Sequence, residues 1–358
     1  MSGDRSDEPT GTTRRYASCR HLERGLVFYP GALHACCANP ATGLTPRLAE
    51  FGSGGLAAIE RVRAGRNGIR ERHKAGDIVA ECQGCPRLEE FEWESDKFQT
   101  EESVDEITIA HFTTCNIRCN YCYTVTREAE WTAPVSKVPR LLETFSQMIK
   151  TGELAPYAKV RFSGGEPTLL PEFDALLTLL SEYGVTSVIY TNAVKRSQSI
   201  IDALRRDRVE VIMGVDAATP AVYRAIKKMD YNEAVWRNVA EYCANERPNA
   251  TNPCWAKFIV TEENYRETGL FVRRAAKAGV RHVYYDVDAS RIESRGGRNG
   301  AMPEEIGDSI ALLRYECLAR GIEVSFMQVG LAWFTPERER RIETEFGRLM
   351  GAHRTGPQ

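Results

Sequence analysis

The sequence lacks any long hydrophobic run, and its longest ones, such as VEVIMGV at residues 209–215, are no longer than a β-strand. A helix that crosses a membrane needs about 20 mostly apolar residues, so we expect no membrane-spanning segment. The opening stretch MSGDRSDEPTGTTRR is polar and lacks the apolar centre of a secretory signal peptide. We therefore expect a cytoplasmic protein, with residues 1–15 as a disordered leader and residues 351–358 as a disordered tail.

Net charge and basic tracts are also lacking. The 358 residues include 47 Lys and Arg against 49 Asp and Glu, which gives a net charge of −2. No stretch collects the basic side chains that a phosphate backbone attracts. The charge balance therefore argues against a nucleic-acid partner.

Cysteine, by contrast, is plentiful and unevenly placed. The sequence has 11 cysteines, and eight of them lie before residue 123, namely Cys19, Cys36, Cys37, Cys82, Cys85, Cys115, Cys119 and Cys122. The reducing cytoplasm disfavours a disulfide framework, and clustered cysteines there more often bind metal or take part in catalysis. The first third of the chain is therefore expected to carry metal.

From about Val104 to Asp288, short apolar runs alternate with amphipathic segments. Runs such as EITIAHF, SVIYTN and HVYYDVD are strand-like, whereas segments such as EFDALLTLLSEYG have the period of a helix. This alternation is typical of parallel β/α units. It predicts an α/β fold with a partial (β/α)6 TIM-like barrel over residues 101–290. Residues 16–100 are expected to form an N-terminal module, and residues 291–350 a short α/β C-terminal extension.

The segment HFTTCNIRCNYCYT follows the first predicted barrel strand and has the spacing C-x3-C-x2-C. A short loop that carries Cys115, Cys119 and Cys122 can present three thiolates to three irons of a cubane cluster. The fourth iron would keep an open position for other atoms, as a catalytic zinc ion does. Two alternatives stay open: a zinc site completed by His111 or a distant cysteine, and buried cysteines of a core loop.

A second motif, RFSGGEPTLL, follows the next predicted strand and contains Gly164, Gly165, Glu166 and Pro167. Two adjacent glycines let a backbone approach a ligand closely and expose polar groups to it. Taken alone, the motif is also compatible with an ordinary turn. Its position one β/α unit after the cysteines indicates a shared binding site.

These two motifs make the sequence resemble the radical S-adenosylmethionine (radical SAM) enzymes over roughly residues 104–290. The resemblance implies that the three loop cysteines hold a catalytic 4Fe–4S cluster, whose open iron is chelated by S-adenosylmethionine. It also implies that Tyr121 lies near the adenine and that Gly164 to Glu166 contact the methionyl amino group. The family cleaves this cofactor with an electron from the cluster, so a donor such as flavodoxin or ferredoxin is expected as a partner.

Two later strand ends resemble family patterns for further cofactor contacts. YTNA offers Thr191 and Asn192 for the ribose or the carboxylate, and MGVDAAT offers Asp216. This chain has Gly214 where the family pattern usually has a serine. For Asn192 and Asp216, ordinary capping and turn formation at a strand end are the alternative roles.

The N-terminal cysteines form a second candidate set. ECQGCP contains Cys82 and Cys85, and Cys19 and Cys36 supply two further thiolates, with Cys37 as the alternative to Cys36. CRHLERGLVFYPGALHACCANP resembles the auxiliary-cluster module called SPASM or Twitch, which usually follows the barrel and here precedes it. The resemblance implies a second, auxiliary 4Fe–4S cluster. Structural zinc and unliganded thiols are the alternatives.

Weaker candidates lie at the predicted mouth of the barrel. Asp286 and Asp288 end the sixth strand and would favour a substrate with an amine, or they cap a turn. Lys257 and Asn264, around the fifth strand, are candidates for substrate or cofactor contacts. Cys254 opens that strand and is a candidate hydrogen-atom donor, although a free cysteine is more often a small buried hydrophobe.

The sequence therefore predicts a radical SAM oxidoreductase that abstracts hydrogen from an unactivated C–H bond. The expected substrate is carbohydrate-like, such as an amino sugar or a nucleotide sugar, or a peptide. Epimerisation, dehydrogenation and bond formation are all compatible with the motifs. The alternatives are a radical SAM enzyme that modifies tRNA or another nucleic acid, and a non-catalytic metal-binding scaffold.

Overall fold

The computed structural model describes residues 15–36, 43–50, 56–93, 103–122, 140–288, 305–326 and 334–355. The chain divides into two compact units. Unit 1 contains residues 1–111 and 133–160, and unit 2 contains residues 112–132 and 161–358. This division differs from the predicted boundary between residues 100 and 101, because β6 (Val104–Ile109) pairs with β2 (Gly25–Tyr29) of the N-terminal part.

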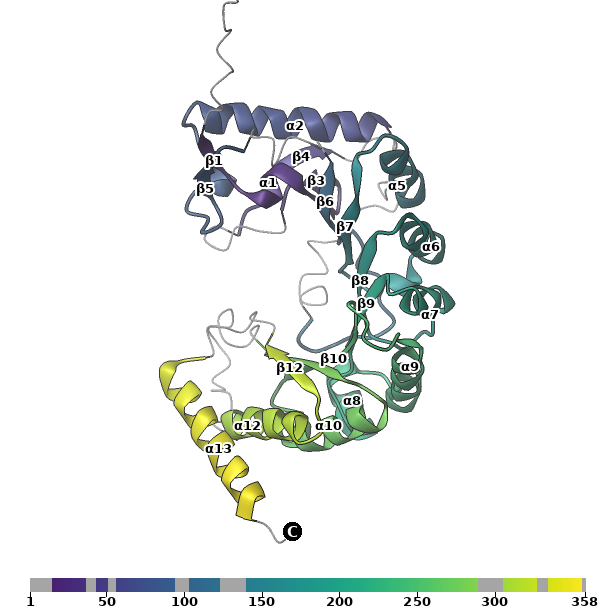
Figure 1. The fold of residues 1–358 in the computed structure, drawn as a ribbon, viewed down its shortest axis with the longest axis vertical. Coiled ribbons are helices and arrows are strands. Elements are labelled where there is room, and N and C mark those ends of the chain that lie inside the picture. The colour runs from purple at the N-terminus through teal and green to yellow at the C-terminus, as the bar shows by residue number, and fades with distance from the viewer. Residues whose placement is uncertain are drawn as a thin grey trace, which may run out of the picture. The chain divides into compact units, whose positions relative to one another are not determined.

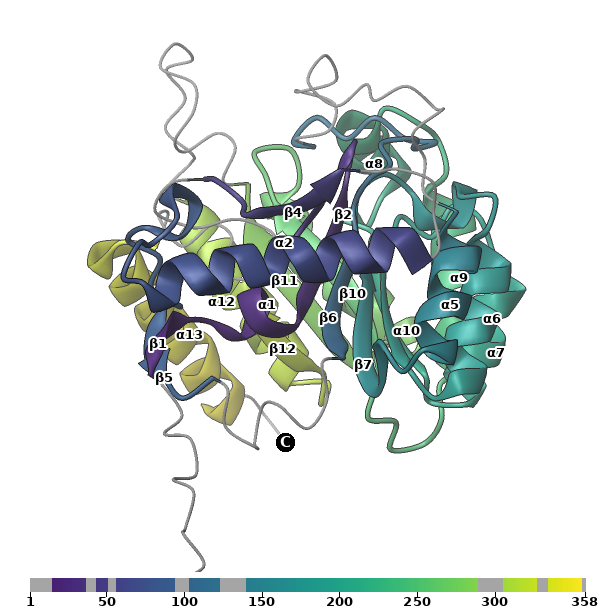
Figure 2. The same ribbon diagram turned by 90° about the horizontal axis from the view of Figure 1, so that it is seen from above.

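Unit 1 joins an antiparallel meander to a parallel strand. Its other elements are β1 (Tyr16–Ser18), α1 (Arg20–Arg24), β3 (Ala32–His34), β4 (Arg47–Glu50), α2 (Leu56–Lys74), η1 (Ala80–Cys82), β5 (Glu89–Phe91), α5 (Leu141–Lys150) and the start of β7 (Leu154–Phe162). Strands β2, β3 and β4 are antiparallel neighbours, β6 runs parallel to β2, and β1 pairs with β5. The long helix α2 packs on β4 (Figure 2). Phe28 of β2 stacks on Phe145 of α5, with ring centroids 5.9 Å apart.

Unit 2 is built from parallel strands joined by helices. Its strands are β8 (Thr186–Thr191), β9 (Val209–Gly214), β10 (Cys254–Val260), β11 (His282–Val287) and β12 (Glu323–Phe326). Its helices are η3 (Pro167–Leu169), α6 (Phe173–Tyr183), α7 (Gln198–Arg205), α8 (Pro220–Lys227), α9 (Asn232–Asn245), η4 (Tyr265–Glu267), α10 (Thr268–Lys277), α12 (Glu305–Leu318) and α13 (Pro336–Thr355). The strands pair in chain order, each parallel to the next. Figure 1 shows α6, α7 and α9 side by side along β8 and β9.

Side chains along the strands of unit 2 alternate between the helices and the opposite face of the sheet. On β10, Phe258 faces the helices and contacts Phe271 of α10, with ring centroids 4.5 Å apart. Its neighbours Lys257 and Ile259 line a pocket instead. The strands of unit 2 are all parallel and direct apolar side chains toward the helices, as in a partial (β/α)6 barrel. This arrangement confirms the predicted fold class.

Two features concern the C-terminal extension and the surface. Helix α13 continues to Thr355, five residues into the predicted tail, since the first Gly-Pro pair after it comes at residues 356–357.

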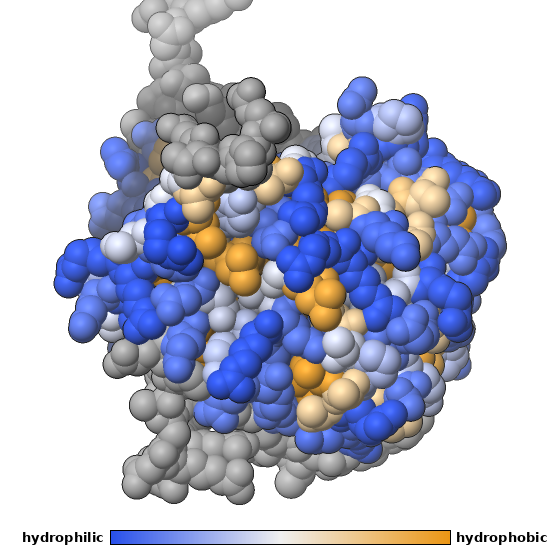
Figure 3. Space-filling model, turned by 90° about the horizontal axis from the view of Figure 1, so that it is seen from below, coloured by the Kyte–Doolittle hydropathy of each residue, from blue (hydrophilic) through white to orange (hydrophobic). Residues whose placement is uncertain are grey.

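In the described parts of the chain, no helix combines the length and apolarity that a membrane span requires. On the face shown in Figure 3, hydrophobic side chains are scattered among hydrophilic ones.

Candidate functional site

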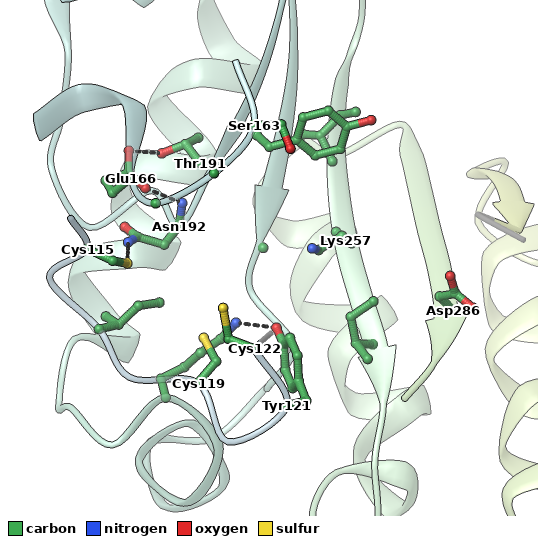
Figure 4. Close-up of a pocket in the computed structure, with 18 of the residues that line it drawn as sticks. Cys115, Cys119, Tyr121, Cys122, Ser163, Glu166, Thr191, Asn192, Lys257 and Asp286 are labelled. Atoms are coloured by element: carbon green, nitrogen blue, oxygen red, sulfur yellow. Dashed lines mark hydrogen bonds between the residues drawn. The ribbon is translucent and has the colours of Figure 1, made fainter. Parts of the chain in front are cut away.

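A pocket of about 430 Å³ opens in unit 2 at the carboxyl ends of its strands (Figure 4). The predicted site residues that line it are Cys115, Cys119, Tyr121, Cys122, Gly164, Gly165, Glu166, Thr191, Asn192, Asp286 and Asp288. These residues come from one loop, one turn and the ends of two strands, which are far apart in sequence. The carboxyl ends of parallel strands are where barrels of this type place their ligands, so the pocket is the candidate active site.

Two neighbouring segments hold the cysteine loop by its backbone. At its start, Gly165 N–H donates to Phe112 O over 2.9 Å, and Glu166 N–H donates to Thr114 O over 2.8 Å. At its end, two loop amides donate to the last carbonyls of α8, in the pairs Arg118 N to Lys227 O and Asn120 N to Ile226 O, both 3.0 Å. Carbonyls at a helix C-terminus have no partner within the helix. The loop amides supply these carbonyls with hydrogen-bond donors, and the same bonds fix the position of the loop.

The two glycines of the turn are required by this close approach. A Cβ on Gly165 would lie 2.2 Å from Thr114 O, and a Cβ on Gly164 would lie 2.7 Å from Phe112 O. Gly164 also has φ +149°, a conformation that side chains disfavour. No other residue type therefore lets the turn lie against the start of the cysteine loop.

Glu166 joins the turn to the end of β8. Its buried carboxylate accepts hydrogen bonds from Thr191 Oγ1 at 2.8 Å and from Asn192 N at 2.7 Å. It also accepts from Thr168 Oγ1 at 2.7 Å and Thr168 N at 3.2 Å. Burial raises the pKa of Glu166, and these donors oppose the rise. The carboxylate is thus engaged by the protein, and the neighbouring glycine backbone is left to face the pocket.

The thiols of the cysteine loop lie in contrasting surroundings. Burial raises the pKa of Cys115, and a hydrogen bond from Asn192 Nδ2, 3.6 Å from the sulfur, opposes this. Burial also raises the pKa of Cys119, and the ammonium of Lys227 opposes this. Iron replaces the proton of a thiol when it binds, and nearby donors and cations favour the anionic sulfur that results. The donor set therefore fits a cluster with three cysteine ligands.

A buried group of three side chains lies beside the loop. Asp216 accepts hydrogen bonds from Tyr121 Oη and Lys227 Nζ, and Lys227 Nζ also donates to Tyr121 Oη over 2.9 Å. Burial favours the neutral form of Asp216, but Lys227 and Lys257 hold its pKa below the ordinary value. Asp216 is 0% exposed and does not line the pocket. In this structure Asp216 supports Tyr121, and a cofactor contact through Asp216 stays a prediction.

Lys227 is a site residue that sequence reasoning missed. A lysine in the last turn of a helix usually points to solvent and complements the helix dipole. The available signal was its spacing, since Tyr223, Ile226 and Lys227 share one helix face and all three are buried.

Lys257 lines the pocket, and Figure 4 shows it between the cysteine loop and Asp286. A Cβ at Gly214 would lie 3.5 Å from Lys257 Cε and 3.9 Å from its Nζ. The lysine therefore approaches the space that a side chain at position 214 would enter. Both distances are ordinary van der Waals contacts, so Lys257 packs over Gly214 and a Cβ there would not displace it.

Cys254 is not brought to the pocket. It is fully buried at the opposite end of β10, and its backbone N–H donates to Glu246 over 2.8 Å. A contact with Cys243 of α9, together with burial, raises its pKa. A hydrogen-atom donor has to reach the substrate, so this position argues against that role and favours the packing role.

In unit 1, three of the N-terminal cysteines are neighbours. Burial raises the pKa of Cys82 to about 12, and the charges of Cys19 and Cys85 add to this. Cys36 follows β3, and Cys37 lies outside the described residues. No three His, Cys, Asp or Glu side chains in the described ranges converge as ligands of one metal ion. Cysteines of a cluster bind separate irons and need not converge in this way.

Comparison with known proteins agrees with this geometry. Residues 109–271 match the profile of the Radical SAM superfamily. A 90-residue stretch is 30% identical to an S-adenosylmethionine-dependent nucleotide dehydratase of Flammeovirga pacifica, and covers 24% of this chain and 30% of that protein. A 131-residue stretch is 23% identical to the GTP 3′,8-cyclase of Haemophilus influenzae, and covers 35% of this chain and 37% of that protein. The chain thus spans about a third of the length of these curated relatives.

The fold also resembles a solved structure, that of Streptococcus suis SuiB bound to S-adenosylmethionine. The TM-score is 0.50 at 15% identity, and the match covers 78% of this chain and 58% of SuiB. Proteins of the matched superfamily use S-adenosylmethionine and a 4Fe–4S cluster, and the pocket supplies three cysteines and a glycine turn for them. Residues 109–271 thus form a radical SAM domain.

Proposed function

We propose that this protein is an enzyme that binds a 4Fe–4S cluster through Cys115, Cys119 and Cys122 and binds S-adenosylmethionine beside it. The observation that carries the proposal is the convergence of these cysteines, the Gly164–Gly165 turn and the end of β8 on one pocket of about 430 Å³. That volume is within the usual range of ligand pockets.

The residues around the pocket have separable roles in this proposal. The backbone of Gly164 and Gly165 contacts the methionyl part of the cofactor, because no side chain stands between it and the pocket. Glu166 fixes that turn to Thr191 and Asn192. Asn192 stabilises the Cys115 sulfur through its amide N–H.

Tyr121 offers its ring to the adenine. Its hydroxyl is held by Asp216 and Lys227, so the ring is fixed before the cofactor binds. When bound, the cluster and S-adenosylmethionine supply a 5′-deoxyadenosyl radical that takes a hydrogen atom from an unactivated C–H bond. The protein orients the substrate and limits the access of water to the pocket.

The substrate that we propose is carbohydrate-like, with a nucleotide sugar as the first choice. Asp286 and Asp288, both buried at the end of β11, can accept hydrogen bonds from hydroxyl or amino groups. Lys257 lines the same side of the pocket and can bind a phosphate. The names of the two curated relatives also refer to nucleotides as substrates.

We further propose that Cys19, Cys82 and Cys85, with Cys36, hold an auxiliary 4Fe–4S cluster in unit 1. The charges of Cys19 and Cys85 add to the rise in the pKa of Cys82, which supports the nearness of these three thiols. An electron donor such as flavodoxin or ferredoxin would supply the electron.

Iron and sulfide contents after anaerobic reconstitution test the cluster assignments. We expect about eight irons in the wild type and about four in a variant with Cys115, Cys119 and Cys122 replaced by Ala. A variant with Ala at Cys243 and Cys317, two cysteines of helices α9 and α12, is the matched control and should retain the wild-type iron content. Equal iron in the triple variant and the wild type would overturn the catalytic assignment.

Formation of 5′-deoxyadenosine tests the reaction. With dithionite and S-adenosylmethionine, we expect its formation to be stimulated by nucleotide sugars more than by nucleotides, free amino sugars or peptides. Iron binding without any 5′-deoxyadenosine would instead support a non-catalytic scaffold. Stimulation by peptides alone would overturn the proposed substrate class and keep the proposed chemistry.

A further inference from the structure

Lys257 differs from the other charged residues of the pocket in having no partner within the protein. The carboxylate of Glu166 accepts hydrogen bonds from its own turn and from β8, and Lys227 forms an ion pair with Asp216. Within the described ranges of the chain, Lys257 forms no hydrogen bond and no ion pair, even with Asp286 of the neighbouring strand. Charges that are withdrawn from water are usually paired. This half-buried ammonium is therefore available to an anionic ligand.

The strand register and the lean of the side chain fix where the ammonium lies. On β10, Lys257 pairs with Gly214 of β9 on one side and with Tyr284 of β11 on the other. A Cβ at Gly214 would lie 3.5 Å from Lys257 Cε, 3.9 Å from Lys257 Nζ and 3.8 Å from Thr191 O. The side chain therefore extends from β10 across β9, toward the end of β8. Figure 4 shows its nitrogen on the side away from Asp286.

The end of β8 belongs to the part of the pocket that we assign to the cofactor. Thr191 and Asn192 are joined there through Glu166 to the glycine turn, whose backbone contacts the methionyl part in the proposed function. The methionyl part of S-adenosylmethionine has a single anionic group, its carboxylate, and the adenosine has none. The carboxylate is thus the anion of the cofactor that matches the charge of Lys257.

A phosphate of the substrate is the competing occupant, because a lysine ammonium binds either anion. The lean of the side chain toward β8, and the lack of an ion pair with Asp286, favour the carboxylate of the cofactor. Gly214 brings no polar side chain to this level of the sheet, so β10 supplies the polar contact in place of β9. Asp286 and Asp288 remain for the hydroxyl or amino groups of the substrate.

We propose that Lys257 binds the methionyl carboxylate of S-adenosylmethionine and thereby determines the specificity of the pocket for this cofactor. The inference rests on the proposed function, since it requires that the pocket binds S-adenosylmethionine. The ammonium has no partner among the described residues, so binding the carboxylate breaks no contact within them. A hydrogen bond between an ammonium and a carboxylate is among the stronger ones that proteins form.

Lys257→Met tests the proposal, because methionine keeps an unbranched side chain and removes the charge. Anaerobic equilibrium dialysis of the reconstituted full chain, without a reductant, measures the affinities for S-adenosylmethionine and for decarboxylated S-adenosylmethionine, which lacks the carboxylate. We expect Lys257→Met to weaken the binding of S-adenosylmethionine about 10- to 100-fold, as for a hydrogen bond between charged groups. The affinity for the decarboxylated ligand should stay unchanged. Lys277→Met, at an exposed lysine of α10, is the matched control and should change neither affinity.

The two ligands separate a direct contact from a structural effect. An equal loss of affinity for both would show that the substitution disturbs the pocket as a whole, and it would overturn the assignment. Unchanged binding of S-adenosylmethionine by Lys257→Met would also overturn it, and a fall in the affinity for UDP-glucose instead would identify a substrate phosphate as the occupant. If the reconstituted wild type does not bind S-adenosylmethionine, the proposed function itself fails, and the two failures are thereby distinguished.

Discussion

Replacing Lys227 with methionine should destabilise unit 2 substantially. Lys227 is 2% exposed and its partner Asp216 is 0% exposed, so the substitution leaves a buried carboxylate without its nearest cation. Removing one member of a buried ion pair typically costs about 3–5 kcal/mol. Asp216 keeps hydrogen bonds from Tyr121 and Ile259 N, which places the expected loss in the free energy of unfolding at about 3 kcal/mol.

Urea unfolding of the metal-free protein, followed by tryptophan fluorescence and circular dichroism, measures this loss. With an m-value of about 3 kcal/mol/M, the midpoint should fall by about 1 M. Lys228→Met is the matched control, because Lys228 is the next residue, has φ +60° and is exposed. We expect that control to change the free energy of unfolding by less than about 0.5 kcal/mol.

The loss should depend on pH in a defined direction. In the wild type the folded-state pKa of Asp216 lies below its ordinary value, so its stabilisation is present above the unfolded pKa and is lost as pH falls through the folded one. Without Lys227, burial raises that pKa, and protonation at low pH removes the cost of the buried charge. The difference between the wild type and Lys227→Met should therefore be larger at pH 7.5 than at pH 5.

Two results would refute this reasoning. The first is a difference below about 0.5 kcal/mol at pH 7.5, which is the size expected at an exposed position. The second is a difference that does not change with pH. A double variant, Asp216→Asn with Lys227→Met, should recover part of the lost stability, because it removes both charges and Asn also tolerates the positive φ of 58° at position 216.

Two further predictions concern the turn beside the cysteine loop. Gly165→Ala should abolish cluster reconstitution, because its Cβ would lie 2.2 Å from Thr114 O, whereas Gly214→Ala meets its nearest neighbour at 3.5 Å and should retain the iron content of the wild type. Equal iron in the two variants would contradict the requirement for a close backbone approach. Glu166→Gln should lower the free energy of unfolding by about 1–3 kcal/mol. The NH₂ group of the glutamine would face donors that now form hydrogen bonds to the carboxylate of Glu166. Urea unfolding checks this against the exposed Glu182→Gln, and equal midpoints would show that the carboxylate is not needed as an acceptor.

The sequence predicts those parts of the fold and of the site that depend on local patterns. The alternation of strands and helices from Val104 to Asp288 is recorded in the spacing of apolar residues along the sequence. The cysteine spacing and the two glycines of the turn are fixed by the short segments that contain them. For this reason the fold class and the pocket-lining positions at these two motifs follow from the sequence.

Other parts depend on contacts between distant segments, which no local pattern records. Lys227 is an ordinary helix-terminal lysine until α8 packs against the cysteine loop. Asp216 has the sequence pattern of a ligand-binding residue at a strand end. Its role depends on a hydrogen bond from Tyr121, which lies 95 positions earlier in the chain. The boundary at residue 100 was placed in an acidic segment, whereas the pairing of β6 with β2 joins the two sides of it.

The hydrogen bonds between α8 and the cysteine loop also set an order for biosynthesis. The loop leaves the ribosome early, but Lys227, which holds Tyr121, is 106 residues further along the chain. At about 5–20 residues per second, translation needs several seconds to supply that helix. During this interval the three cysteines are present without the contacts that position them. Iron–sulfur assembly at this loop is therefore expected to follow the synthesis of α8, and a truncated chain that ends before residue 220 should not retain a cluster.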